Sequence, residues 1–160
     1  MAKILIIYYS RTGNTKKMAE FVAEGAKAKG AEVNVKEAAN VESRELLDYD
    51  GIIVGSPTYY GAVAYEVKRV LDESVDFHGE LEGKVGGAFS SAANIGGGNE
   101  TTVLNILNAM LIHGMIIQGA YQGDHYGSVS IGEPNSRVEG QCKALGQRVA
   151  VLADKLHAKK

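Results

Sequence analysis

Short apolar runs alternate with amphipathic segments of helical spacing, and this alternation most limits what the chain can fold into. The run 3–9, KILIIYY, is almost continuously apolar, as is typical of a strand buried on both faces of a parallel sheet. The runs 50–55 and 84–91 have the same character, although two glycines weaken the second. Val33 and Val35 alternate with polar residues in 31–36, which predicts a strand nearer the sheet edge.

The segments between these runs carry apolar residues at intervals of three and four. Met18, Val22 and Ala26 predict a helix that begins after Gly13 and ends at Gly30. The same spacing predicts helices over 63–74 and 100–112, and a last helix from Ser136 to Leu156. Ser136 and Glu139 match a capping box, and Ser43 is a candidate cap for a short helix ending at Leu47. The run 115–121 predicts the fifth strand.

Five strands separated by helices favour one α/β domain over residues 1–160. Parallel strands need crossover connections of this length, and such crossovers are right-handed, so helices should cover both faces of the sheet. The sequence therefore predicts a doubly wound, five-stranded parallel sheet. In such sheets a ligand binds at the carboxyl ends of the strands, where the strand order reverses.

Composition and charge exclude several classes of function. The net charge of −2 gives no electrostatic reason to bind nucleic acid, and no apolar run reaches the roughly 18 residues of a membrane span. The start has no signal-peptide pattern, and a single cysteine allows no internal disulfide, so we expect a cytoplasmic protein. Cys142 falls on the apolar stripe of the last helix and is expected to fill the core. His78, His125 and His157 lack metal-ligand spacing, so no metal site is expected.

The first loop, 10–15, follows the opening strand and starts a helix. Its side chains are hydroxyls, an amide and one guanidinium, and its residues are Ser10, Arg11, Thr12, Gly13, Asn14 and Thr15. Backbone N–H groups and the positive end of the helix dipole favour a phosphate there, although the same residue types also make a plain helix cap. The nucleoside triphosphatase and dinucleotide-binding glycine motifs are both absent, so a terminal monophosphate fits better.

Two further loops follow strand ends. The second loop, 56–61, places two aromatic rings beside a rigid proline, and its candidate binding residues are Pro57, Thr58, Tyr59, Tyr60 and Gly61. The third loop, 90–99, exposes backbone N–H groups through small side chains, and its candidates are Ser91, Ala92, Ala93, Asn94, Ile95, Gly96 and Gly97. A phosphate cradle, aromatic surfaces and backbone donors together suit flavin mononucleotide (FMN). The tyrosines could also be ordinary surface residues.

These segments resemble a known family. SRTGNT at 10–15 is similar to the phosphate loop of flavodoxins. The closer resemblance is to the WrbA-type NAD(P)H:quinone oxidoreductases. It rests on MAKILIIYYS at 1–10, LLDYDGIIVGSPTYYG at 46–61, FSSAANIGGGNETT at 89–102, HGMII at 113–117 and YGS at 126–128. The matches run in family order over nearly the whole chain.

The resemblance implies FMN on a flavodoxin-like fold, with three layers and the strand order 2-1-3-4-5. It implies that the first loop holds the phosphate, that 57–61 line the isoalloxazine, and that 91–97 contact its pyrimidine end and the ribityl chain. His113 is expected beside the flavin, as a cofactor contact and catalytic residue, and Tyr126 near the active-site mouth as a second catalytic residue. A histidine before a buried strand can equally be a hydrogen-bonded core residue.

Departures from the family pattern affect the acceptor and the assembly more than the FMN. The chain is shorter than the quinone reductases and lacks an insertion before the third strand that helps to build their tetramer. Tyr59 and Tyr60 replace an arginine–phenylalanine pair, and Phe77 or His78 falls near the position of the family's tryptophan. Family sites form partly between subunits, so a homodimer or homotetramer is expected.

Three functions remain open. The first is an oxidoreductase that passes hydride from NAD(P)H through FMN to quinones, with His113 donating a hydrogen bond or proton to the acceptor. The second is an electron-carrier flavodoxin that acts on a redox partner protein. Such carriers are strongly acidic, whereas this chain has 17 basic and 19 acidic residues. The third is a partner-binding protein without a cofactor. Asp124 and His125 form either an acid–base pair or a solvated turn.

Overall fold

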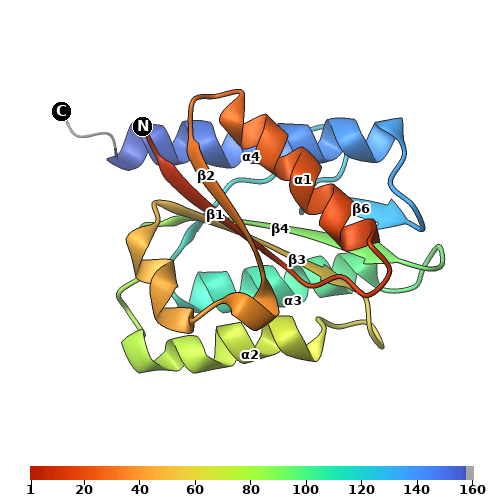
Figure 1. The fold of residues 1–160 in the computed structure, drawn as a ribbon, viewed down its shortest axis with the longest axis horizontal. Helices are drawn as coiled ribbons and strands as arrows, with labels where there is room; N and C mark the ends of the chain where they lie inside the picture. Colours follow the sequence, from red (N-terminus) through yellow and green to blue (C-terminus); the bar gives the residue numbers. More distant parts are fainter. Residues whose placement is uncertain (158–160) are drawn as a thin grey trace.

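A parallel sheet forms the centre of the protein in the computed structural model, which describes residues 1–157 (Figure 1). Its strands are β1 (Lys3–Tyr8), β2 (Glu32–Glu37), β3 (Gly51–Pro57), β4 (Val85–Ala92), β5 (Ile116–Ile117) and β6 (Ser128–Ile131). The order β2-β1-β3-β4-β5 confirms the flavodoxin-like order 2-1-3-4-5. The sixth strand, β6, pairs with β4 and was not expected.

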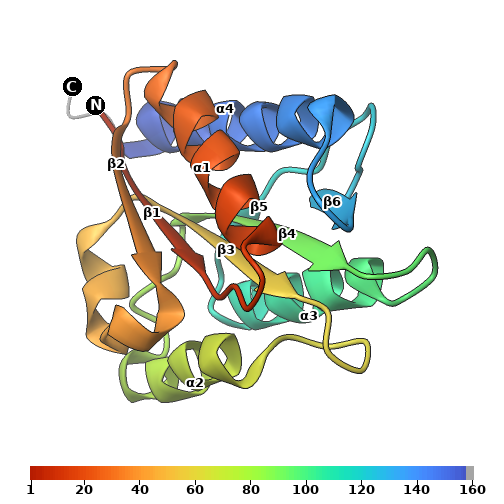
Figure 2. The ribbon, with the colours of Figure 1, turned by 45° about the vertical axis from the view of Figure 1, so that its right-hand side comes forward.

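Helices cover both faces of this sheet, as the alternation predicted (Figure 2). α1 (Asn14–Lys27) and α4 (Ser136–His157) lie on one face, and α2 (Tyr65–Glu73) and α3 (Asn99–Ile112) lie on the other. Successive residues of β1 point to opposite faces, so Ile4 and Ile6 join the core under α1 and α4, whereas Leu5 and Ile7 join the core over α2 and α3. Each fully buried aliphatic side chain contributes about 1.5–3 kcal/mol.

Side-chain caps differ from the prediction at two helices. The N-terminus of α4 is capped by Asn135, whose Oδ1 accepts the backbone N–H of Val138 at 3.1 Å. The capping box expected at Ser136 is therefore wrong, because the N-cap lies one residue earlier. The segment predicted as a short helix is a 3-10 helix, Ser43–Asp48, and its capping box pairs Glu42 with Glu45 instead of using Ser43.

The predicted strand 115–121 is also wrong in length. Only Ile116 and Ile117 pair with β4, at Val85 and Gly86. Gln118 and Gly119 follow, and a glycine weakens a strand, so the chain leaves the sheet there. It returns at β6, which pairs with β4 from Phe89 to Ala92. Two short strands therefore share the position at which the sequence predicted one.

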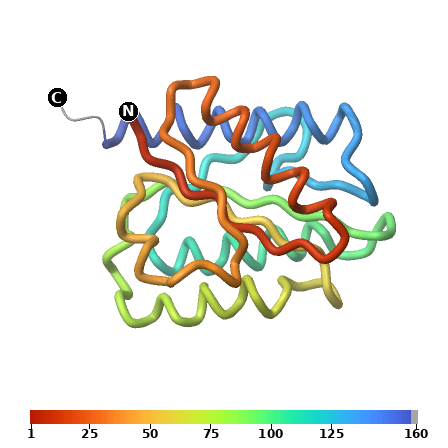
Figure 3. Tube along the Cα trace, in the orientation of Figure 1, coloured from red at the N-terminus to blue at the C-terminus, as the bar shows by residue number. Residues whose placement is uncertain are grey.

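The connections after β1, β3 and β4 gather at one end of the sheet, whereas the chain begins and α4 ends at the opposite side (Figure 3). This arrangement follows from the parallel strands, because their carboxyl ends share an edge. Within residues 1–157 no helix has the length and apolar character needed to cross a membrane.

Candidate functional site

The three loops singled out in the sequence line one cavity of about 630 Å³ at the carboxyl ends of β1, β3 and β4. This volume lies within the range of small-molecule sites. Its lining residues are Arg11, Thr12, Asn14, Thr15, Pro57, Thr58, Tyr59, Ser91, Ala92, Ala93 and Gly132. The structure thus brings together residues that lie up to 121 positions apart in the chain, from Arg11 to Gly132.

The first loop presents the amino end of α1 to this cavity. Gly13 adopts a left-handed φ of 100° and precedes Asn14, the first residue of the helix. A side chain is rarely found in that conformation, so glycine suits the turn. Among residues 1–157 no side chain caps this helix, and the N–H groups of a first helical turn have no acceptor within the helix. The Ser10 hydroxyl accepts the Gly13 N–H at 3.0 Å, which holds the turn in shape.

Thr15 joins the first loop to the third. Its side chain is buried, and its Oγ1 lies 2.9 Å from the Ser91 Oγ at the end of β4. Thr12 and Arg11 of the same loop are exposed at the cavity. The loop therefore has one hydroxyl that fastens it to the scaffold and others that remain free for a ligand.

The second loop is fastened to the third by backbone and hydroxyl groups. Thr58 donates its N–H to the Ser91 carbonyl at 2.8 Å, and its Oγ1 lies 3.0 Å from the Ser90 Oγ. Thr101 Oγ1 donates to the Gly61 carbonyl at 2.7 Å, or to the Gly98 carbonyl at 2.8 Å. These bonds hold the walls of the cavity at a set separation.

Gly98 allows the second and third loops to approach closely. It is the N-cap of α3 and has a left-handed φ of 105°. A Cβ atom on Gly98 would lie 2.8 Å from the Gly61 Cα, which is closer than real contacts allow. A glycine is therefore required by both the backbone angle and the contact.

Aromatic side chains flank the mouth of the cavity. The Tyr59 ring meets the Tyr9 ring edge to face at 6.4 Å. Desolvation, followed by the nearby Glu66 carboxylate, raises the pKa of Tyr9 above its usual value. Tyr60 is fully exposed, with a φ of 51° that is uncommon for a residue with a side chain. A flat ligand could stack on these rings.

The electrostatics of the cavity favour an anion. Of its lining residues, all within the described part of the chain, only Arg11 carries a charge. Lys17, in the first turns of α1, pairs with Glu133 at 3.1 Å and so joins that helix to the connection after β6. The lining, all of it within residues 1–157, contains no carboxylate, so no negative charge there would repel a phosphate.

Several predicted residues lie outside the cavity lining. Ser10, Gly13, Tyr60 and Gly61 shape the first and second loops without lining the cavity. The outer part of the third loop, Asn94 to Gly97, is exposed, and Ile95 is 91% exposed. The third loop lines the cavity with its inner residues, Ser91, Ala92 and Ala93.

Sequence reasoning missed Gly132, because it depends on β6, which no pattern predicted. Its N–H donates to the Ala92 carbonyl at 2.8 Å, and this bond brings the connection after β6 to the cavity. Tyr9 does not line the cavity but contacts Tyr59 with its ring, and the sequence showed it only as part of the apolar run of the first strand. Its position directly before the polar loop was the one available signal.

His113 lies away from the three loops of its own chain, so within one chain it is not near the cavity, and its contact with a cofactor stays a prediction. α3 starts at the cavity end and rises about 20 Å over its 14 residues, so its C-cap His113 lies at the other end of the sheet. The next residue, Gly114, accepts the N–H of Gly83, just before β4 begins. The C-terminal position on an α/β crossover helix is the physical reason for this separation.

The surroundings of His113 match a core residue. The Ser74 hydroxyl donates to the Leu71 carbonyl at 2.6 Å, so it accepts from the His113 Nε2 at 2.7 Å. Phe77 stacks on the imidazole at 6.5 Å, and the His78 ring lies 5.5 Å away. Burial, and then the charge of His78, lower the pKa of His113. The other ring nitrogen, Nδ1, is buried without a partner among the described residues.

Tyr126 is half-exposed and lines a small separate cavity with Glu100 and Val103 in the first turns of α3. This places it on the carboxyl side of the sheet but outside the lining of the three-loop cavity. Asp124 and His125 do not form an acid–base pair. The Asp124 carboxylate binds the Val129 N–H and Arg137, and the His125 Nδ1 lies 2.7 Å from the Ala120 carbonyl.

Cys142 is part of the core beneath α4, as its position on the apolar stripe predicted. Burial raises the pKa of its thiol to about 12. The residues that the structure describes contain no cluster of histidine, cysteine and acidic side chains that could hold a metal ion.

Comparisons with known proteins converge on one family. Residues 5–92 match the model of the flavodoxin domain. A protein from Aquifex aeolicus named flavodoxin is 45% identical over 94% of this chain and 86% of its own length. A protein from Archaeoglobus fulgidus named NAD(P)H dehydrogenase (quinone) is 38% identical over 98% of this chain and all of its own. The crystal structure of a WrbA-like flavodoxin from Agrobacterium tumefaciens superposes with a TM-score of 0.81 at 26% identity, covering 98% and 99% of the two chains.

Proposed function

Because this chain belongs to the flavodoxin family, we propose that it binds FMN and passes hydride from NAD(P)H through the flavin to quinones or similar two-electron acceptors. Its similarity to a quinone dehydrogenase and a WrbA-like structure supports the WrbA-type branch. The single observation that carries the proposal is the three-loop cavity, in which the uncapped amino end of α1 faces a ligand-sized space.

The residues present fit FMN. A phosphate against the first loop would meet the free N–H groups of α1 and the hydroxyl of Thr12, with no carboxylate in the lining to repel it. Bound FMN would supply the two-electron redox chemistry. Pro57, Thr58 and Tyr59 would line the flat ring, and the rigid proline would limit how far that wall can move.

The protein's part in the reaction is to orient the ring and to stabilise charge. Backbone N–H groups of residues 91–97 would donate to the pyrimidine end as negative charge develops there. The bonds from Thr58 to Ser90 and Ser91 hold these two walls before any ligand arrives. Preorganised donors of this kind need no rearrangement at the moment of hydride transfer.

The charge of the cavity supports an enzyme over a pure carrier. Arg11 is the one charged residue that lines the three-loop cavity in the described chain. Its positive charge would attract NAD(P)H, which is an anion. A carrier that docks basic partners would instead surround its flavin with acidic residues.

Tyr126 and His113, the two expected catalytic residues, have different places in this proposed site. Tyr126 stays at the rim, where its half-exposed hydroxyl could reach an acceptor beside the first turns of α3. His113 takes no part within its own chain. It could meet a flavin only across an interface in the homodimer or homotetramer that the family resemblance implies.

An electron-carrier flavodoxin is the second candidate, and the similarity to the Aquifex aeolicus protein named flavodoxin favours it. Steady-state kinetics separate the two. The FMN-loaded protein is mixed with NADH or NADPH and benzoquinone, and nicotinamide oxidation is followed by absorbance. The oxidoreductase gives turnover that saturates in both substrates, whereas a carrier gives almost none until a separate reductase is added. Absence of turnover with a panel of quinones would reject the enzyme proposal.

A further inference from the structure

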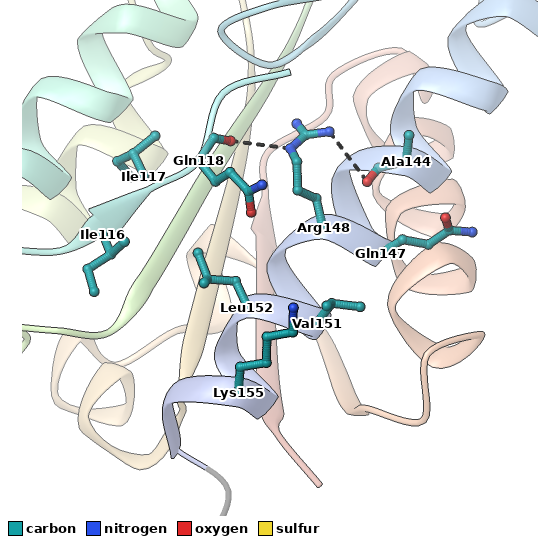
Figure 4. Close-up of a pocket in the computed structure, with 9 residues that line it drawn as sticks. All are labelled: Ile116, Ile117, Gln118, Ala144, Gln147, Arg148, Val151, Leu152 and Lys155. Carbon is teal, nitrogen blue, oxygen red and sulfur yellow. Dashed lines mark hydrogen bonds between the residues drawn. The ribbon is translucent and has the colours of Figure 1, made fainter. Parts of the chain in front are cut away.

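A second groove lies at the far edge of the sheet, between β5 and α4 (Figure 4). We call it the edge groove. It has a volume of about 600 Å³ and is lined by Ile116, Ile117, Gln118, Ala144, Gln147, Arg148, Val151, Leu152 and Lys155. β5 pairs with the first residues of β4, so the groove belongs to the amino half of the sheet, away from the three-loop cavity.

The groove exists because β5 is so short. Its six α4 residues recur at intervals of three and one and therefore form a single stripe on that helix. The neighbouring stripe of α4, with Leu145, Val149 and Ala153, is buried in the core. β5 ends at Ile117. A longer fifth strand would cover this stripe of α4, but the two-residue strand leaves it open. Apolar surface stays open there: Ile116 is 39% exposed and Val151 is 38% exposed.

Two cations flank this apolar floor. The Arg148 Nε donates to the Gln118 carbonyl at 3.2 Å, and its guanidinium also donates to the Ala144 carbonyl at 3.5 Å, so the guanidinium is held at the Ala144 end of the groove (Figure 4). Lys155 lies two turns further along the same stripe. No acidic residue lines the groove, and neither cation forms an ion pair within residues 1–157. Desolvation lowers the pKa of Arg148, and no carboxylate offsets it.

The dimensions favour a small molecule as the occupant. The volume lies within the range of sites that enclose one small ligand. An added peptide strand would need a longer partner edge, and β5 offers only two residues.

From this combination of an open apolar floor and two uncompensated cations, we propose that the edge groove binds a small amphipathic carboxylate. The hydrocarbon part lies against Ile116, Val151 and Leu152. The carboxylate lies against Arg148, whose planar guanidinium suits a carboxylate well, and Lys155 adds a second positive charge further along the groove. This site is independent of the proposed flavin chemistry, because the two cavities share no lining residue.

Octanoate is a direct probe. Protein with labelled isoleucine, leucine and valine methyl groups is titrated with octanoate and followed by NMR, without FMN and again with it. The methyl signals of Ile116, Ile117, Val151 and Leu152 should shift saturably, with the same dissociation constant in both series. 1-Octanol has the same chain without the charge and should bind at least tenfold more weakly.

Two glutamine substitutions test the cations. The double variant R148Q/K155Q should bind octanoate at least tenfold more weakly, and K155Q alone should show part of that loss. Lys155 is exposed, so K155Q is expected to fold even if the double variant does not. K29Q removes an exposed lysine on another segment and serves as the matched control, with unchanged affinity.

Four outcomes would overturn the proposal: saturable shifts confined to other methyl groups, no saturable binding at all, equal affinity for octanol, or unchanged affinity in K155Q and the double variant. A shift of the groove signals with protein concentration alone would also overturn it, because it would assign the groove to a second copy of the chain.

Discussion

Hydroxyl and nitrogen-bearing side chains gather at both ends of the sheet. Their hydrogen bonds surround a cavity at one end and lie inside the core at the other. At the carboxyl ends, Thr15, Thr58 and Ser91 bond one loop to another around an open cavity. At the amino ends, His113 and Ser74 bond to each other inside the core, and His113 has only 9% of its surface exposed. The comparison teaches that residue type does not identify a site. Polar groups form a binding site when their hydrogen bonds surround an open cavity. They form part of the core when their hydrogen bonds are buried and leave no cavity.

The largest expected effect is on phosphate binding at the carboxyl end. Thr12→Asp places a negative charge in the first loop, where we propose the FMN phosphate. Like charges about 4 Å apart repel by roughly 4 kcal/mol at an effective dielectric constant of about 20. We expect the dissociation constant for FMN, measured by quenching of flavin fluorescence, to rise at least about 100-fold.

Two controls sharpen that test. Riboflavin lacks the phosphate, so its affinity should change little in Thr12→Asp. Thr12→Val removes the hydroxyl without adding charge and should weaken FMN much less. Equal losses for FMN and riboflavin would mean that the first loop does not hold the phosphate.

The contact between the second and third loops should matter for stability. Gly98→Ala forces a side chain into a left-handed backbone and against the Gly61 Cα, so we expect a loss of about 2–3 kcal/mol of unfolding free energy. Gly30→Ala is the matched control, because Gly30 has a φ of 83° but nothing within 4 Å of a Cβ atom. Urea denaturation should show a loss of only about 1 kcal/mol there. Equal losses of unfolding free energy in Gly98→Ala and Gly30→Ala would mean that the contact between Gly98 and Gly61 does not contribute to stability.

Arg11 should affect the nicotinamide more than the flavin. Arg11→Gln removes the one charge that lines the three-loop cavity in the described chain, so the KM for NAD(P)H should rise about two- to fivefold, a typical effect of one exposed charge. The kcat should stay within about twofold, as expected when only binding is lost. Lys27→Gln removes an exposed charge at the other end of α1 and should change neither constant. A kcat loss without a KM change would place Arg11 in the chemical step instead.

The smallest effect is expected at the amino end. In monomeric protein, His113→Asn should leave the FMN dissociation constant within about twofold of the original, because His113 lies away from the loops of its own chain. Its clearer signature is pH dependence. Burial lowers the folded-state pKa of His113 below the unfolded value of about 6.5, so the unfolded chain binds more protons as the pH falls through that range.

The stability associated with neutral His113 is therefore present above pH 6.5 and is lost as the pH falls below it. His113→Asn should therefore lose less stability than the original protein between pH 7.5 and pH 5.5 in urea denaturation. An unchanged pH slope, or a large loss of FMN binding in the monomer, would contradict the placement of His113 in the core.

Much of the fold could be predicted because it depends on local pattern. The apolar run of β1 and the spacing of Met18 and Val22 identify a buried strand and a helix without knowledge of any partner. The first loop could be predicted for the same reason, since polar residues directly follow a buried strand. Gly132 could not, because it depends on where β6 returns to β4. The Asn135 cap is a local bond to Val138, but Asn135 and Ser136 are both good cap residues, so residue type alone did not choose between them.

By itself, the sequence determined the alternation of strands and helices, the three polar loops and the family to which they point, because each follows from residue types at short spacing. Only the tertiary structure decided that the fifth strand is divided, that His113 faces Ser74 in the core, and that α4 leaves a cationic groove at the sheet edge. These features depend on contacts between residues far apart in the chain, such as Arg148 with Gln118. No pattern of short spacing contains that information.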